Sequence, residues 1–218
     1  MARKEIPFVH LWERHVSLYF GIFHRALLEL EVNEKQKSRE DAISEKLCPY
    51  LKEQCFMHKD KPQTPSWEAP IPPISINNLS GGKKRKRPDF TSILTDPFAL
   101  NAEVFEVSLH IECKRLGEKA GTWNLNRNYV TEGIKRFDDE HQYGRNVGNG
   151  FMIGYIVSMD PTEIQQEVNK YIQDLHVGSS NLSFEFSAKV VSCNIQFNRK
   201  SVQPYNFSLT HLWVDLRN

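Results

Sequence analysis

The amino-acid sequence predicts a mixed α/β protein. Apolar residues recur three to four positions apart between residues 8 and 55, which is the period of a helix. From residue 74 the period falls to two, and helix-like and strand-like segments then alternate to the end of the chain. An apolar content of 39% and a charged content of 25% over 218 residues are typical of a globular chain that can bury a core.

The N-terminal region predicts two helices. The first runs from Phe8 to about Leu30, with an apolar stripe at Trp12, Val16, Tyr19, Phe23 and Leu27, and the charged stretch 31–37 ends it. The second starts at Ser38, where Ser38-Arg39-Glu40-Asp41 resembles a capping box, and its stripe is Ile43, Leu47, Tyr50 or Leu51, and Cys55. The Pro-rich segment 58–73 is expected to be a loop.

Three strands are expected next, arranged as a meander. The first covers Ile74 to Leu79 and ends at the turn Ser80-Gly81-Gly82. The second opens at Pro88-Asp89-Phe90 and runs to Leu94. The third is longer, from about Val104 to Leu116.

The second half of the chain continues the alternation. Asn126 or Asn128 is expected to cap a helix that carries Val130, Ile134 and Phe137. The segment 151–157 is apolar on both faces, as in a central strand. Asp160-Pro161 starts another helix, and alternating apolar residues predict strands in the tail: Phe184, Phe186 and Ala188; Val191, Cys193, Ile195 and Phe197; Leu212, Val214 and Leu216.

We expect these elements to form one compact domain with three parts. Residues 1–37 form an N-terminal helical extension, residues 38–158 form the core, and residues 159–218 add a helix and strands packed on that core.

Composition narrows the class of protein. The net charge of +1 provides no global basic surplus, so only local charge can indicate nucleic-acid binding. We expect no secretory leader, because charges interrupt residues 1–15, and no membrane span, because no apolar run approaches the required ~18 residues. The cysteines (Cys48, Cys55, Cys113 and Cys193) have neither zinc nor disulfide-scaffold spacing and are expected in or near the core. We therefore expect a soluble, intracellular, cytoplasmic protein that does not bind membranes.

The segment 107–114 carries the most informative pattern. Alternate side chains of a strand point to opposite faces, so Val107, Leu109, Ile111 and Cys113 share an apolar face. Ser108, His110, Glu112 and Lys114 share the other face. Burying an acid or an ammonium alone is costly, so Glu112 and Lys114 need a partner or a function.

Asp89 is expected to approach Glu112 if the two strands pair. Two carboxylates and a backbone carbonyl, such as that of Cys113, form the oxygen-only site that Mg²⁺ accepts. A neighbouring Lys114 can orient a water or stabilise charge on phosphorus. The alternatives are a cross-strand Glu112–Lys114 ion pair on a half-exposed face and a turn role for Asp89.

The pattern Pro88-Asp89, 22 residues, then Glu112-Cys113-Lys114 resembles the signature of the PD-(D/E)xK nucleases, the restriction-endonuclease-like superfamily. Each half of the pattern occurs once in the chain. The predicted order over residues 38–158 (helix, three-strand meander, helix, strand) also resembles the core of that family.

The resemblance implies a nuclease that depends on Mg²⁺, with Mn²⁺ as a substitute, and that hydrolyses phosphodiester bonds in DNA. Endonucleolytic cleavage and a role in restriction or phage defence are expected, and RNA is not excluded. Asp89, Glu112 and the Cys113 carbonyl would hold the metal, Lys114 would serve the nucleophilic water, and Glu40 would add a further acid. Glu40 otherwise suits any first helical turn.

The same resemblance implies that a dimer mate or a partner protein supplies specificity. The alternative function is an inactive subunit of this fold that binds nucleic acid or assembles with a partner. An unrelated protein-interaction module, in which the triplet is incidental, is the third hypothesis.

Several basic residues are candidate DNA contacts: Lys83, Lys84, Arg85, Lys86, Arg87, Lys135 and Arg136. Lys83 to Arg87 also suits a solvated turn or a nuclear localisation signal, and Lys135 and Arg136 can equally face water. His110 can approach the metal or simply form a hydrogen bond. Tyr129, Arg136 and Tyr143 recur seven apart and suit either base stacking or packing at the core edge.

Overall fold

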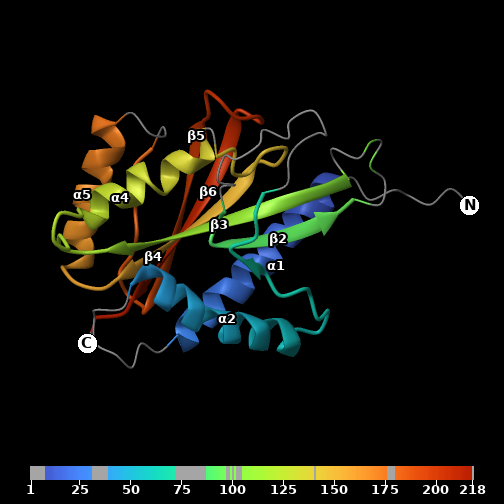
Figure 1. Ribbon diagram of the computed structural model, residues 1–218, viewed down its shortest axis with the longest axis horizontal. Coiled ribbons are helices and arrows are strands. Elements are labelled where there is room, and N and C mark those ends of the chain that lie inside the picture. The colour runs from blue at the N-terminus through green and yellow to red at the C-terminus, as the bar shows by residue number, and fades with distance from the viewer. Residues whose placement is uncertain are drawn as a thin grey trace, which may run out of the picture.

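The protein is an α/β fold built on one six-stranded mixed sheet (Figure 1). The computed structural model describes residues 8–30, 39–71, 87–96, 99, 101, 105–139, 141–175 and 180–217. Its helices are α1 (Phe8–Glu29), α2 (Glu40–Met57), α4 (Leu125–Thr131), the 3₁₀ helix η2 (Ile134–Phe137) and α5 (Pro161–Asp174). Its strands are β1 (Ser66–Trp67), β2 (Phe90–Thr95), β3 (Glu106–Leu116), β4 (Asn149–Ile156), β5 (Val190–Asn198) and β6 (Asn206–Asp215).

The sheet has a parallel centre and antiparallel edges. The strand order is β1-β2-β3-β4-β6-β5, in which β3, β4 and β6 run parallel while β1 and β2 on one side and β5 on the other run antiparallel to their neighbours. Parallel neighbours need long crossover connections, and α4, η2 and α5 lie in those connections. Strand β6 follows β5 in the chain but lies between β4 and β5 in the sheet, so the edge strand on this side is β5.

Each face of the sheet has its own hydrophobic core. Helices α1 and α2 cover one face through residues such as Phe23 and Leu47, which pack with Ile111 and Phe151 of the central strands. Helices α4, η2 and α5 cover the other face with a cluster that includes Tyr129, Phe137, Ile164, Ile172, Met152 and Trp213. Because both faces are covered, the central strands are buried on both sides, as the apolar segment 151–157 predicts.

Most of the predicted helices and strands are confirmed, and the corrections concern several boundaries, the first strand and the tail. Helix α1 matches its predicted range closely. Helix α2 begins at Glu40 rather than Ser38, which lies outside the described residues. Its cap residue is Arg39, whose side chain makes no capping hydrogen bond.

The first strand of the meander differs from the prediction. Residues 74–79 lie outside the part of the chain that the structure describes. The strand that pairs with β2 is instead Ser66–Trp67, within the segment predicted to be a loop. Two residues are too few to show an alternating pattern, so this strand leaves no periodic signal in the sequence.

The predicted helix after β3 is two elements. Asn124, not Asn126 or Asn128, caps α4, and its side chain accepts a hydrogen bond from the Arg127 N–H. Helix α4 ends at Thr131, so Ile134 lies on the separate 3₁₀ helix η2. Gly133 separates them with a non-helical backbone (φ −123°, ψ −83°). A Cβ at Gly133 would lie only 2.4 Å from the Tyr129 carbonyl oxygen.

The tail was also predicted with one strand too many. Phe184 and Phe186 alternate in sequence, but they lie in irregular chain before β5. Their rings instead pack against Trp213, at centroid distances of 4.3 and 6.2 Å. The two-residue interval between Phe184 and Phe186 therefore places both rings against Trp213 and does not mark a strand. Among the described residues no helix has the length and apolar character needed to cross a bilayer.

Candidate functional site

The site forms where β3 extends beyond its pairing with β2. The last paired residues are Phe90 and Ile111, so on this side the Cys113 and Arg115 N–H groups lie beyond the β2 ladder. Carboxylates take the place of the missing strand: the Cys113 N–H donates to Asp89 Oδ2 at 2.6 Å and the Arg115 N–H donates to Glu40 Oε2 at 3.1 Å. Buried backbone donors require such partners, and this requirement fixes both acids at the strand end.

Lys114 joins an acid of α2 to an acid of β3. Its Nζ donates to Glu40 Oε1 at 2.8 Å, to Glu112 Oε1 at 2.6 Å and to the Cys113 carbonyl oxygen at 2.8 Å. An ammonium group has three protons, so these bonds use its full donor capacity. The cation therefore lies among oxygens from α2 and from β3 itself.

Glu112 is the most deeply buried acid of the site. Its exposed fraction is 0%, and that of Lys114 is 8%. The same oxygen that binds Lys114, Oε1, also accepts a hydrogen bond from Arg136 Nη1 on η2. The second oxygen, Oε2, is buried and has no hydrogen-bond partner among the described residues. A buried carboxylate oxygen without a partner is energetically costly, which makes it a candidate ligand atom.

Burial and mutual repulsion shift the pKa values of the acids upward. Burial raises the Asp89 pKa to about 6, although Lys114 and the Cys113 N–H partly offset the shift. Burial and the neighbouring Asp89 raise the Glu112 pKa to about 8, against the opposing effect of Lys114 and Arg136. Burial lowers the Lys114 pKa, but Glu112, Glu40 and Asp89 outweigh it and keep the pKa above its usual range. Added positive charge would therefore stabilise the two carboxylates.

The donor set suits a divalent cation in chemistry. Asp89, Glu112 and the Cys113 carbonyl offer only oxygen atoms, which are the ligands that Mg²⁺ and Mn²⁺ accept. The unpartnered Glu112 Oε2 fits the same purpose. Within the described ranges no three His, Cys, Asp or Glu side chains form a ready-made metal cage. The Lys114 ammonium explains why the acids are not arranged as a cage: it is bonded to three of the local oxygens and takes the place that a cation would have among them.

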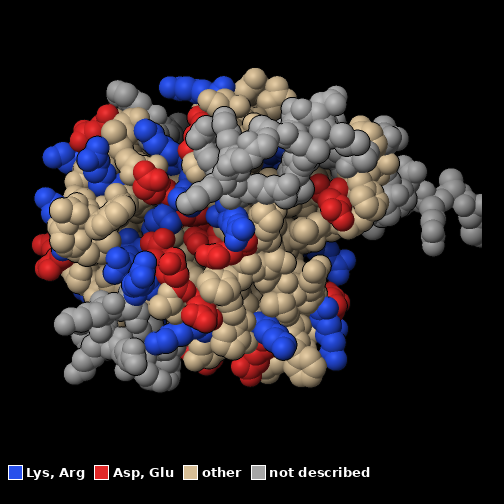
Figure 2. Space-filling model, viewed as in Figure 1, with Lys and Arg blue, Asp and Glu red and all other residues tan. Residues whose placement is uncertain are grey.

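A cleft of about 690 Å³ opens beside these residues. Glu40, Lys114 and Arg136 contribute to its lining, together with Arg39, Asp41, Arg115, Trp123, Leu125, Asn128 and Glu132. Acidic and basic side chains are interspersed over the part of the surface where Figure 1 places α2, α4 and the end of β3 (Figure 2). The polar face of β3 is thus buried at Glu112 and reaches solvent through the cleft.

Two alternatives from the sequence are resolved by these positions. The Glu112–Lys114 pair does not lie on a half-exposed sheet face, because Glu112 is fully buried under η2. Asp89 does more than occupy a turn, because its side chain binds the β3 backbone.

The other candidates differ in position. Residues 83–86 lie outside the described residues, and Arg87 is exposed. Arg136 pairs with Glu112, while Lys135 is partly exposed. His110 is buried and its Nδ1 accepts a hydrogen bond from the Gly144 N–H, so the simple hydrogen-bond interpretation holds. Burial lowers its pKa to about 3.

Base stacking by the tyrosines is wrong. Tyr129 and Tyr143 are fully buried in the core between the sheet and its covering helices. The Tyr143 hydroxyl has no hydrogen-bond partner among the described residues, and burial and Glu112 raise its pKa. The four cysteines are free and are buried or half-buried, as expected.

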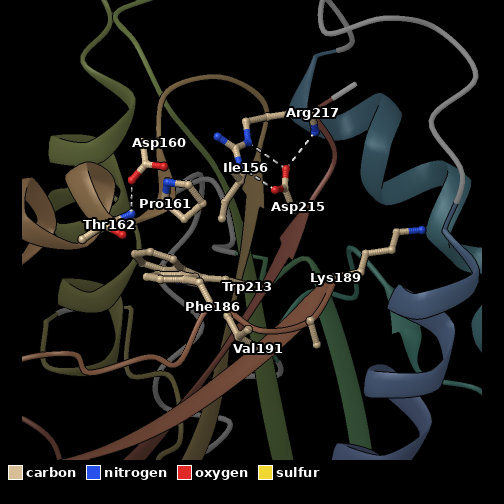
Figure 3. A pocket seen from close by; sticks show the side chains of 11 residues that line it. Ile156, Asp160, Pro161, Thr162, Phe186, Lys189, Val191, Trp213, Asp215 and Arg217 are labelled. Atoms are coloured by element: carbon tan, nitrogen blue, oxygen red, sulfur yellow. Dashed lines mark hydrogen bonds and ion pairs between the residues drawn. The ribbon is translucent and has the colours of Figure 1, made fainter.

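A second cavity, of about 290 Å³, lies at the carboxyl ends of β4 and β6 (Figure 3). Its charged groups are already engaged: Arg217 pairs with Asp215, and Asp160 caps α5 through the Thr162 N–H. The Lys189 side chain extends toward α1, where Nζ donates to the Leu28 and Leu30 carbonyls (Figure 3). This cavity therefore offers a ligand little beyond its Trp213 and Phe186 rings.

Sequence reasoning missed two features of the site. The sequence predicted that Arg136 faces a phosphate or water. The predicted helix was continuous, and the break at Gly133, after which η2 carries Arg136 to Glu112, has no signal in the apolar pattern. Sequence reasoning also did not single out Trp123 or Arg115 as cleft residues. Arg115 directly follows the acid-x-Lys triplet, but only the unpaired edge of β3 shows that it lies at the site.

Comparison of the chain with protein-family models, with curated proteins and with solved structures finds no match. The α/β class therefore rests on the sheet and its helices, and the site on its own geometry.

Proposed function

We propose that the protein is a restriction-endonuclease-like, divalent-metal-dependent nuclease that hydrolyses phosphodiester bonds in DNA. One observation carries the proposal. The carboxylates of Glu40, Asp89 and Glu112 and the ammonium of Lys114 meet where β3 extends beyond its pairing with β2, and one Glu112 oxygen there is buried without a partner among the described residues.

Asp89, Glu112 and the Cys113 carbonyl are the groups that would hold Mg²⁺ or Mn²⁺. A bound divalent cation supplies Lewis-acid activation of a phosphate oxygen and lowers the pKa of a bound water. The raised pKa values of Asp89 and Glu112 agree with a site that is short of positive charge.

The remaining residues have roles that follow from their contacts. Lys114 is cationic and lines the cleft, so its charge can stabilise negative charge that develops on phosphorus, and it can orient a water once one of its three hydrogen bonds is released. Glu40 holds both Lys114 and the Arg115 backbone, so it positions the ammonium. Arg136 reaches both Glu112 and the cleft, where its guanidinium can bind a phosphate oxygen.

A second candidate function is an inactive subunit of this fold that binds nucleic acid. The observation that favours it is the saturation of Glu112 Oε1 by two cations, Lys114 and Arg136. These two cations offset part of the charge of the three acids, so the site can be stable without a metal. The two candidates differ in whether DNA is cut.

The test is cleavage of plasmid and linear DNA with Mg²⁺, with Mn²⁺ and with EDTA. Metal-dependent cutting is expected from the wild-type protein, and Asp89→Ala, Glu112→Ala and Lys114→Ala are each expected to lose it. Glu118→Ala and Lys119→Ala are matched controls, because this acid and this lysine are exposed just beyond the end of β3.

The outcomes separate the candidates. Cutting that persists in all three site variants would refute the assignment of the site. Salt-dependent DNA binding without any cutting, in the presence of either metal, would favour the inactive subunit.

A further inference from the structure

The four tryptophans of the chain fall into two pairs. Trp12 and Trp213 are buried in the cores, with exposed fractions of 6% and 0%. Trp67 and Trp123 are exposed, at 40% and 62%. Of these two, Trp123 lines the cleft beside Lys114, whereas Trp67 lies on β1 and does not line it. A large exposed aromatic ring in the wall of a cleft indicates a surface for a ligand.

The backbone holds Trp123 in a fixed place. Ala120 and Trp123 exchange two backbone hydrogen bonds, at 2.9 and 3.1 Å, in a tight turn. The next residue, Asn124, caps α4 with its side chain. The backbone that carries the indole is therefore held in place before any ligand binds, which lowers the entropy lost on binding.

An arginine side chain lines the same cleft. Arg115 is partly exposed, and its Nε is buried without a hydrogen-bond partner among the described residues. Guanidinium groups bind phosphate oxygens with strong, charge-assisted hydrogen bonds. An aromatic ring and a guanidinium whose Nε has no partner among the described residues together match the two parts of a nucleotide, its base and its phosphate.

We propose that the cleft binds unpaired nucleotides, so that the substrate at this site is single-stranded DNA with a base stacked on Trp123 and a phosphate bound by Arg115. The inference rests on the proposed function for the DNA substrate and extends it to the state of the strand. The bases of a duplex hide their faces in the stack, whereas a single strand presents them. A cleft of about 690 Å³ is within the range of ~300–1,000 Å³ that holds small ligands.

Binding measured in EDTA tests the inference without cleavage. The probes are a fluorescent oligothymidine of about 15 nucleotides, near the upper end of known single-strand site sizes, and a labelled DNA duplex of equal length at the same salt. We expect the wild-type protein to bind the single strand at least ~10-fold more tightly. Trp123→Ala should weaken single-strand binding by ~5–150-fold, the range for loss of one stacked base, and should leave duplex binding unchanged.

Trp67→Ala is the matched control, because it removes an exposed tryptophan outside the cleft; its binding should stay within about twofold of the wild type. Arg115→Met should weaken single-strand binding and reduce its dependence on salt by about one counterion. Circular dichroism of each variant checks that the fold is retained.

Three results would overturn the inference: equal or tighter binding of duplex, equal losses in Trp123→Ala and Trp67→Ala, or no binding of either probe. The proposed function is tested separately by cleavage. Metal-dependent cutting together with duplex preference would overturn this inference alone. Trp123-dependent binding of the single strand without cutting would support it while refuting the nuclease.

Discussion

Replacing Lys114 by methionine removes the charge that holds the site together while keeping a side chain of similar length. The substitution deletes three hydrogen bonds, to Glu40, to Glu112 and to the Cys113 carbonyl. Glu112, which is fully buried, would keep only its contact with Arg136. Breaking a buried ion pair by removing one partner costs about 3–5 kcal/mol. Because Arg136 remains and Glu40 is partly exposed, we expect about 3 kcal/mol, the lower end of that range.

The assay is urea unfolding of the metal-free protein in EDTA at pH 9, above the Glu112 pKa of about 8, so that the carboxylate is ionised in the wild-type protein; Lys119→Met is the exposed-lysine control. The double variant Glu112→Gln/Lys114→Met should be more stable than Lys114→Met alone, because it removes the buried charge together with its partner. A loss below about 1 kcal/mol in Lys114→Met, or a double variant no more stable than the single one, would refute Lys114 as the main counter-ion of Glu112.

The remaining predictions concern the scaffold. Burial lowers the pKa of His15 to about 4 and that of His211 to about 3, so protonation favours the unfolded chain. Each histidine should therefore remove about 2 kcal/mol of stability when the pH falls from 7 to 5. Urea unfolding at the two pH values should find a smaller loss in His15→Gln and in His211→Gln than in the wild-type protein. Gly154→Ala should destabilise by about 1–3 kcal/mol in thermal unfolding, because the new Cβ would lie 2.5 Å from Leu116 Cδ1; an unchanged midpoint would contradict this packing. Asn124→Ala should lower stability by about 1 kcal/mol through loss of the α4 cap, and Asn124→Asp, which keeps a capping oxygen, should retain most of it.

The sequence predicts the secondary structure where burial follows a regular period. The stripe of α1 and the alternation of β3 each report which face of one element is buried, and this information is local. The approach of Asp89 to β3 is also predictable, because neighbouring antiparallel strands place their residues opposite each other. The contact of Glu40 with Lys114 places Glu40 beside the acids just before β2 and on β3, where the resemblance implies a further acid.

Other features have no such local signal. The strand Ser66–Trp67 is too short to show a period, and Phe184 and Phe186 alternate because their rings pack on Trp213. The helix break lies at Gly133, where a Cβ would lie 2.4 Å from the Tyr129 carbonyl oxygen, and the η2 helix that follows carries Arg136 to Glu112.

The sequence by itself therefore determined the α/β class, the faces of β3 and the acids and lysine of the candidate site. Only the tertiary structure decided that Glu112 is fully buried with one oxygen unpartnered among the described residues, that Arg136 shares its other oxygen, and that Trp123 and Arg115 line the same cleft. The physical reason is that periodicity records burial within one element, whereas these contacts join segments far apart in the chain, and their distances are set by how β3, α2, α4 and η2 pack.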